Sequence, residues 1–490
     1  MLFRWLSDSD IFLLHENQHR KMQNLDFQNI IEKKFEALKP EIAQAYRELW
    51  KKPELPLLEH QSVAYACRWL EQHGFGVATN IGGIPTSFLG TFDNGDGPVI
   101  GVIAEYDALP GLGNEATPYY APTEEAGGHG CGHNLIGGSN IGAAIAAAHA
   151  MQEMGLKGRV VVIGTPAEEI VYGKIAMLGE GGFDGIDLLL TSHVDYQNGV
   201  LCRPCLSLCH GEFHFSGISG HSGAVRRHNA LEAVELAVQS YERLRAHNFS
   251  DAIVEHVIRN GGLMPGITPD RATLWIYVRH PDLDRAVEVY DYVKSVLKSA
   301  EAITDVAITE QFISASNGYL PNKVVADRLF ANMKQVGPPK WDDKDMEWMK
   351  ELVRACKNTD SFTLDTQMAL HTEGVDPYGQ DDGEASWRIP LGRVNWAQPL
   401  EVPLHNWATT ALSGSDAGFK GPLMASETLA RTIVDLLVHP EIVSQAKDEL
   451  ADRTIEKKSR DPMYGPVNEI TSGAREFWKA YGLEASSTQA

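Results

Sequence analysis

The chain has 490 residues, of which 43% are hydrophobic and 22% charged, and its formal net charge is −22. This length exceeds what a single hydrophobic core usually serves, so we expect more than one domain in a globular protein. The acidic balance disfavours a nucleic-acid-binding protein, because a phosphate backbone requires clustered positive charge.

The first twenty residues do not resemble a signal peptide or a membrane-spanning helix. Their apolar run is short and is interrupted by Ser-Asp-Ser-Asp at residues 7–10, whereas a bilayer span requires about 20 apolar residues. The apolar stretch at residues 141–151 is also too short. With six cysteines and no secretory signal, we expect reduced thiols, a cytoplasmic location and no membrane association.

The N-terminal part of the chain alternates helical and strand patterns. Helices are predicted where apolar residues recur at helical spacing, at residues 26–50, 61–73 and 139–155. Strands are predicted where apolar and β-branched residues run together before a loop, at residues 98–111, 158–169 and 187–195. This alternation predicts an α/β fold with a mostly parallel sheet and flanking helices.

The pattern changes near residue 208. Residues 208–315 contain strands of alternating polar and apolar residues and two long amphipathic helices, which together predict a small α+β unit. We expect this unit to be inserted into a catalytic domain formed by residues 26–207 and 316–445. Residues 446–490 are expected to form a tail that is polar after residue 455 and partly disordered.

Side chains that bind metals cluster in the loops after the predicted buried strands, where open α/β sheets place their sites. One loop is Gly-Gly-His-Gly-Cys-Gly-His-Asn at residues 127–134. Each loop alone has a structural interpretation, such as a small buried thiol or solvated glutamates. Their combination indicates a metal centre, because thiolate, imidazole and carboxylate are the usual donors to zinc and manganese. The candidate donors are Cys131, His133, Glu168, Glu169, His193 and His405.

These motifs resemble the dinuclear metallo-amidohydrolases and aminoacylase-type metallopeptidases, a family that includes hippurate hydrolase and the plant auxin-conjugate hydrolases. The resemblance covers about residues 40–445 and is closest to the B-type subunit of p-aminobenzoyl-glutamate hydrolases. Besides the loops above, it rests on AEYDALPGLG at 104–113, SNGYLPNK at 316–323, DDGEASW at 381–387 and VPLHNW at 402–407.

The resemblance implies two divalent metal ions per chain, manganese or zinc, beside a catalytic carboxylate. Glu168 would be the general base. A metal-activated water would hydrolyse the amide bond of a small-molecule N-acyl or N-aroyl amino acid, such as a p-aminobenzoyl-glutamate-like compound. Whether the thiolate bridges the two ions stays open. The implied metal ligands are Cys131, His133, Glu169, His193 and His405.

The resemblance also makes the inserted unit a lid and dimerisation domain. His221 would stabilise the oxyanion of the tetrahedral intermediate, and Asn260 would contact substrate. Arg279 would bind the carboxylate of the amino-acid half, because a guanidinium fork donates two parallel hydrogen bonds. Lid histidines of this kind act across a dimer interface, so we expect a homodimer, with a sister subunit as the alternative partner.

Supporting roles are expected for three other side chains. Asp107 should orient a ligand imidazole, and His129 and Asp195 should support ligands rather than bind metal. The cysteine-rich segment 202–210 has a first pair spaced like a structural zinc site, but its second pair is too cramped for a separate zinc knuckle.

Other functions stay open at this point. The same chemistry would serve a dipeptidase or an auxin-conjugate or hippurate-type aminoacylase. More remote alternatives are an aromatic-amine hydrolase and a catalytically silent subunit. The intact Glu168, Glu169 and His405 argue against the silent subunit.

Overall fold

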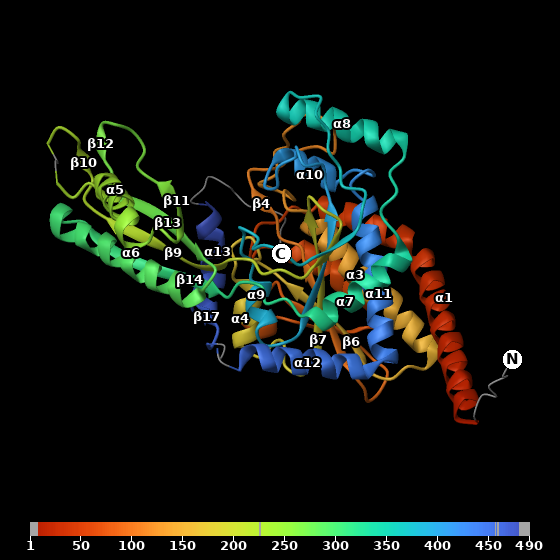
Figure 1. The fold of residues 1–490 in the computed structure, drawn as a ribbon. Helices are drawn as coiled ribbons and strands as arrows, with labels where there is room; N and C mark the ends of the chain where they lie inside the picture. The colour runs from red at the N-terminus through yellow and green to blue at the C-terminus, as the bar shows by residue number, and fades with distance from the viewer. Residues whose placement is uncertain (1–7, 225–226, 456, 458–459, 480–490) are drawn as a thin grey trace.

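The computed structural model describes residues 8–224, 227–455, 457 and 460–479 of the chain. Two main β-sheets organise the fold (Figure 1). None of the helices in this described part is both long and apolar enough to cross a bilayer.

The larger sheet has eight strands in the order β1-β2-β6-β3-β7-β16-β8-β15. Its strands are β1 (Gly76–Thr79), β2 (Phe88–Asp93), β3 (Val99–Glu105), β6 (Arg159–Thr165), β7 (Leu188–Asp195), β8 (Gly199–Leu201), β15 (Ala369–His371) and β16 (Leu391–Ala397). The central pairs β3–β6, β3–β7 and β7–β16 are parallel, whereas β1–β2, β2–β6 and β8–β16 are antiparallel. The predicted α/β fold with a mostly parallel sheet is confirmed.

Helices cover both faces of this sheet, which explains why β3 is buried along its whole length. One face carries α1 (Asp8–Trp50), α2 (His60–Gln72), α3 (His133–Met154), α7 (Lys323–Val336), α11 (Lys420–Val438) and α12 (Pro440–Thr454). The other face carries α4 (Gly173–Gly179), α9 (Asp382–Ser386) and α13 (Val467–Lys479). A smaller apolar cluster joins α8 (Asp343–Lys357) to α10 (Trp407–Ser413). The short elements of this part are η1 (Ile81–Gly83), β4 (Leu109–Pro110) and β5 (Gly127–Gly128).

Glycines let α3 pack closely against β3 and α1. A Cβ atom added at Gly137 would lie 2.6 Å from the backbone oxygen of Glu105, and one at Gly138 would lie 2.5 Å from the ring of Tyr46. Because α3 begins at His133, this close packing sets the position of His133 relative to the end of β3.

The smaller sheet has five strands in the order β11-β13-β9-β14-β17 and carries two helices with a core of their own. It comprises β9 (Ser207–Ser216), β11 (Ile253–Asn260), β13 (Arg271–His280), β14 (Ala307–Ser316) and β17 (Met463–Tyr464), with helices α5 (Ala230–Asn248) and α6 (Leu283–Thr304). A two-stranded extension, β10 (Gly220–His221) with β12 (Ile267–Thr268), lies at the outer end of this unit, away from the larger sheet (Figure 1).

The C-terminal segment differs from the expected polar tail. Strand β17 pairs with β14, and α13 lies between the two sheets (Figure 1). Its Trp478 is buried and donates a hydrogen bond to the backbone oxygen of Pro56 at 2.8 Å. The expectation of a partly disordered tail is therefore wrong for residues 463–479, because this helix has an amphipathic pattern that buries Ile470 and Ala474. Residues 480–490 lie outside the described part of the chain.

The close approach of α3 to β3 generates a stability prediction. Gly137→Ala places a methyl group against backbone rather than a movable side chain, so we expect the free energy of unfolding to fall by about 1–3 kcal/mol. Gly473→Ala is the matched control, because no described atom lies within 4 Å of its ideal Cβ; alanine should there be neutral or stabilise the helix by up to about 1 kcal/mol. Urea unfolding measures both, and a Gly137→Ala variant as stable as wild type contradicts the close packing.

Candidate metal centre

The loops predicted to bind metal converge at the carboxyl ends of the parallel strands. Their donor atoms form three groups in which all atoms lie within 4.8 Å of one another. The groups are Cys131–His133–His193, Cys131–Glu169–His405 and His133–Glu168–Glu169. Cys131, His133 and Glu169 each belong to two of these groups, so the three groups share donors and form one cluster.

Asp107 orients the ring of His133. The Nδ1–H of His133 donates to Asp107 Oδ1 at 2.9 Å, which leaves Nε2 facing the centre. This Nε2 atom lies 3.6 Å from Glu168 Oε2 and 3.8 Å from Glu169 Oε1, and it is buried without a hydrogen-bond partner among the described residues. A buried imidazole nitrogen aimed at carboxylates fits a cation, and the Asp107 contact is the support that metal-binding histidines usually have.

His193 and Cys131 present donor atoms to the same space. The Nδ1–H of His193 donates to the backbone oxygen of Val194 at 2.7 Å, and its Nε2 lies 3.6 Å from Cys131 Sγ. Burial, helped by the charge of Glu169, raises the pKa of the Cys131 thiol to about 12. Burial also lowers the pKa of His193 to about 3. A thiolate at this position therefore requires a cation beside it.

Glu168 and Glu169 lie on a strained loop after β6. Ala167 has a φ of 57° and Val171 a φ of 47°, values that non-glycine residues seldom adopt. Such strain persists only where neighbouring structure holds it. The backbone N–H of Ala167 donates to a buried carboxylate, Glu59 Oε1, at 2.9 Å.

Both glutamate side chains of this loop are almost completely buried. The backbone N–H of Glu169 donates to Asp107 Oδ2 at 2.9 Å, so one aspartate supports both the loop and His133. Burial and then neighbouring carboxylates raise the pKa of Glu168 well above its usual range. Burial raises the pKa of Glu169 to about 8. Ionised together, these side chains require nearby positive charge.

His405 is the most exposed of the donors, with 56% of its side chain accessible. Its Nε2 lies 3.6 Å from Glu169 Oε2, and its backbone N–H donates to the oxygen of Gly130 at 2.8 Å. The second contact ties this distant loop to residues 127–134. His405 thus marks the side on which the centre opens to solvent.

The three predicted substrate contacts lie in different places. Arg279 donates through Nε to Glu255 Oε2 at 2.9 Å, while its buried Nη1 has no hydrogen-bond partner among the described residues. Partial burial, and then the charges of His133 and Arg279, lower the pKa of His405 to about 4. His221 is exposed on the outlying strand β10, and Asn260 is exposed at the end of β11. The described chain does not bring His221 or Asn260 to its own donor groups.

The expected support of ligands by His129 and Asp195 stays a prediction. His129 is buried and its Nε2 contacts the backbone oxygen of Leu49 at 3.1 Å, and Asp195 accepts from Asn395 Nδ2 at 2.7 Å. Neither belongs to a donor group within the described part of the chain, and the same holds for the cysteines of segment 202–210.

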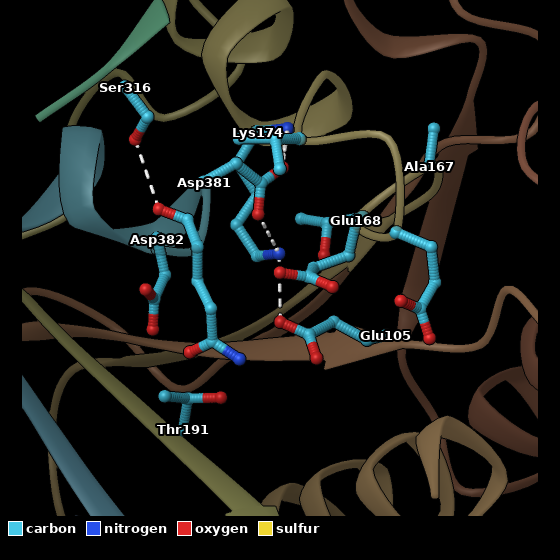
Figure 2. Close-up of polar contacts among 12 residues, drawn as sticks. Glu105, Ala167, Glu168, Lys174, Thr191, Ser316, Asp381 and Asp382 are labelled. Atoms are coloured by element: carbon cyan, nitrogen blue, oxygen red, sulfur yellow. Dashed lines mark hydrogen bonds and ion pairs between the residues drawn. The ribbon is translucent and has the colours of Figure 1, made fainter. Parts of the chain in front are cut away.

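Sequence reasoning missed a buried charged network beside the donors (Figure 2). Lys174 contacts Glu105 and Asp381, and all three side chains are buried. Glu105 and Asp381 lie in segments that carried the family resemblance, but no spacing pattern pointed to Lys174. Burial alone would raise the pKa of Glu105, yet Lys174, His133 and His193 hold it at about 2.

Comparison with known proteins identifies the family. Residues 101–383 match the sequence profile of peptidase family M20/M25/M40. The chain belongs to this family. The family predicted from the loop motifs is therefore confirmed. As a member of the M20/M25/M40 family, the protein is a metal-dependent hydrolase.

Individual members of the M20/M25/M40 family give the degree of similarity. The chain is 28% identical over 434 residues to the B-type subunit of the p-aminobenzoyl-glutamate hydrolase of Escherichia coli, covering 82% of this chain and 90% of that protein. It is 26% identical over 421 residues to the Xaa-Arg dipeptidase of Mus musculus, covering 82% and 87%. A Bacillus subtilis structure, described as a dinuclear metal binding peptidase from the M20 family, has the same fold, with a TM-score of 0.54, 19% identity and coverage of 82% and 99%.

The shared position of Cys131 generates a test of the donor groups. Cys131→Ala removes an atom common to two of the three groups, so we expect bound metal per chain to fall to half or less. Cys209→Ala is the matched control, because Cys209 is also buried but lies in the core of the smaller sheet. Elemental analysis of purified protein measures the metal, and a Cys131→Ala variant with wild-type metal content contradicts the assignment.

Proposed function

We propose that the chain hydrolyses the amide bond of N-acyl and N-aroyl amino acids, with p-aminobenzoyl-glutamate-like compounds as the favoured class. The observation that carries this proposal is an apolar cavity of about 330 Å³ bordered by Glu169 of the donor groups. Aromatic walls of this kind suit the face of an aryl ring. Its apolar lining includes Leu109, Pro110, Ile170, Trp275, Tyr277 and Trp478.

Arg279 could bind the carboxylate at the other end of such a substrate, and it lies on β13, the strand that also carries Trp275 and Tyr277 of the cavity wall. Side chains alternate along β13, so Trp275, Tyr277 and Arg279 lie on one face of the sheet. The unpartnered Nη1 of Arg279 is available to a carboxylate, and a charge-assisted hydrogen bond of this kind fixes orientation. An aryl group in the cavity and a carboxylate at Arg279 would place the intervening amide beside Glu169.

We propose that Cys131, His133, Glu169, His193 and His405 would hold two divalent ions, manganese or zinc. The grouped donors and the unpartnered Nε2 of His133 support this assignment. Divalent cations bound there supply Lewis acidity, which polarises a carbonyl group and makes water more acidic. Glu168, buried next to Glu169, takes the proton from the attacking water and passes it to the amide nitrogen as the bond breaks.

A dipeptidase is the second candidate, and Glu255 favours it. This carboxylate lines the same cavity and would bind the free amino group of a dipeptide, which an N-acyl substrate lacks. The similarity to an Xaa-Arg dipeptidase agrees with this candidate. In the described chain, however, Glu255 pairs with Arg279, so its charge is already partly compensated.

We further propose that residues 208–315 form a lid and dimerisation domain between catalytic segments 26–207 and 316–445. The separate core of the smaller sheet supports this division. Because His221 lies on the outlying β10, it would reach a metal centre through a second copy of the chain, and its role as oxyanion donor requires a homodimer. A sister subunit is the alternative partner, since two of the relatives are named as different subunits of p-aminobenzoyl-glutamate hydrolase. All six cysteines lie in the described residues and are free, which agrees with the proposed cytoplasmic location.

The proposed base generates a direct test. Glu168→Gln preserves size but removes the proton acceptor, so we expect kcat to fall by roughly 10²–10⁴-fold with metal content unchanged. Glu427→Gln is a matched control, because Glu427 is also buried but pairs with Arg431 on α11. Steady-state kinetics and elemental analysis measure the two quantities. Near-normal turnover in Glu168→Gln would assign the base to another group.

The substrate class is tested with matched amides in the presence of manganese or zinc. We expect kcat/KM for p-aminobenzoyl-glutamate to exceed that for acetyl-glutamate and for Xaa-Arg dipeptides by at least about tenfold, because its aryl group would bury more apolar surface in the cavity than an acetyl group and carries no charged amino group. Arg279→Ala should raise KM about tenfold for a substrate with a free carboxylate. KM for the same substrate with that carboxylate converted to an amide should not change. Arg285→Ala is the control, because Arg285 is a partly buried arginine of the proposed lid that pairs with Asp251. Preference for dipeptides would favour the second candidate.

A further inference from the structure

A buried ammonium group lies beside the proposed metal centre (Figure 2). Lys174 on α4 is completely buried, and its Nζ lies 2.8 Å from Glu105 Oε1 and 2.5 Å from Asp381 Oδ1. Its backbone N–H also donates to Asp381 Oδ2 at 2.9 Å. Buried ion pairs contribute little net stability, because desolvation offsets the attraction between the charges. Stability alone therefore does not account for Lys174, and the carboxylate that it holds suggests a function.

Glu105 is the last residue of β3 and is 3% exposed. Lys174 occupies Oε1, whereas Oε2 is buried without a hydrogen-bond partner among the described residues. Oε2 lies 3.7 Å from Nε2 of His133, the nitrogen that is also unpartnered. A buried carboxylate oxygen is seldom left unsatisfied, because it then bears its full desolvation cost.

The two unpartnered atoms do not satisfy each other. The Nδ1 of His133 is engaged with Asp107, so only Nε2 faces Glu105 Oε2. Their 3.7 Å separation is also too long for a hydrogen bond. Two ligands of one cation, with bonds of about 2.1 Å, lie roughly 3.4 Å apart. A cation between these atoms would satisfy both.

We propose that Glu105 is a further donor of the metal centre and that Lys174 is a positioning residue for it. The ammonium group takes one carboxylate oxygen and leaves the other facing His133. Asp381 in turn holds Lys174 through both its side chain and its backbone N–H. This inference rests on the proposed metal centre, and it adds Glu105 to the five donors named above.

The test measures metal affinity and needs no substrate. Manganese is titrated into the metal-stripped full chain while binding is followed by calorimetry, and the melting temperature of the metal-free protein is recorded separately. For Glu105→Gln we expect at least one of the bound ions to be held tenfold or more weakly. Asp435→Asn is the matched control, because Asp435 is buried and pairs with Arg328, on helices α11 and α7. The manganese affinity of this variant should stay within twofold of wild type.

Lys174 is tested through coupling. If it acts by positioning Glu105, any change that Lys174→Met causes in manganese affinity should disappear in the Glu105→Gln background. Persistence of the full change in that background overturns the positioning role. Should Glu105→Gln not fold, Glu105→Asp keeps the charge, withdraws the carboxylate by one methylene, and is judged by the same tenfold criterion.

Three results separate the possibilities. A manganese affinity within twofold of wild type in the Glu105 variant overturns the donor role of Glu105. If the melting temperature of the metal-free variant also falls, Glu105 and Lys174 form a purely structural ion pair. A wild-type chain that binds no manganese and no zinc overturns the proposed metal centre, and this inference with it. Weaker binding in the Glu105 variant alone supports the inference.

Discussion

The structure depends on one electrostatic constraint: several carboxylates are buried around a single imidazole. Glu105, Glu168 and Glu169 all lie within 3.8 Å of His133 Nε2, and Asp107 binds its other nitrogen. Buried negative charges in this number are costly unless cations accompany them. Lys174 supplies one positive charge. The negative charge that Lys174 does not balance favours a bound cation at this place, where the thiol and imidazole donors also lie.

The fold meets this constraint through its parallel strands. The carboxyl ends of β3, β6 and β7 lie side by side, so residues far apart in the chain arrive at one edge of the sheet. Gly137 brings the start of α3 against β3, and the strained turn around Ala167 and Val171 directs two adjacent glutamates to the same space. The smaller sheet then adds the aromatic wall and Arg279 from β13.

Much of this arrangement was predictable because its signals are local. Buried strands followed by Gly-Cys-Gly-His, Glu-Glu and Ser-His motifs indicate both the sheet and the donors, since strand ends share an edge. Lys174 was not predictable, because a lysine in a short helix acquires its role only when Glu105 and Asp381 meet it in the folded chain. The contribution of Trp478 to the cavity was missed for the same reason: its partner Pro56 lies at the other end of the sequence.

The central claim is that these donors hold two divalent ions next to Glu168. Anomalous X-ray diffraction from crystals grown with manganese or zinc, recorded at the absorption edge of the metal, tests it most directly. The account predicts two peaks among these donor atoms, each within about 2.0–2.4 Å of the atoms that bind it. Strong peaks elsewhere on the molecule, with none among Cys131, His133, Glu169 and His193, would contradict it.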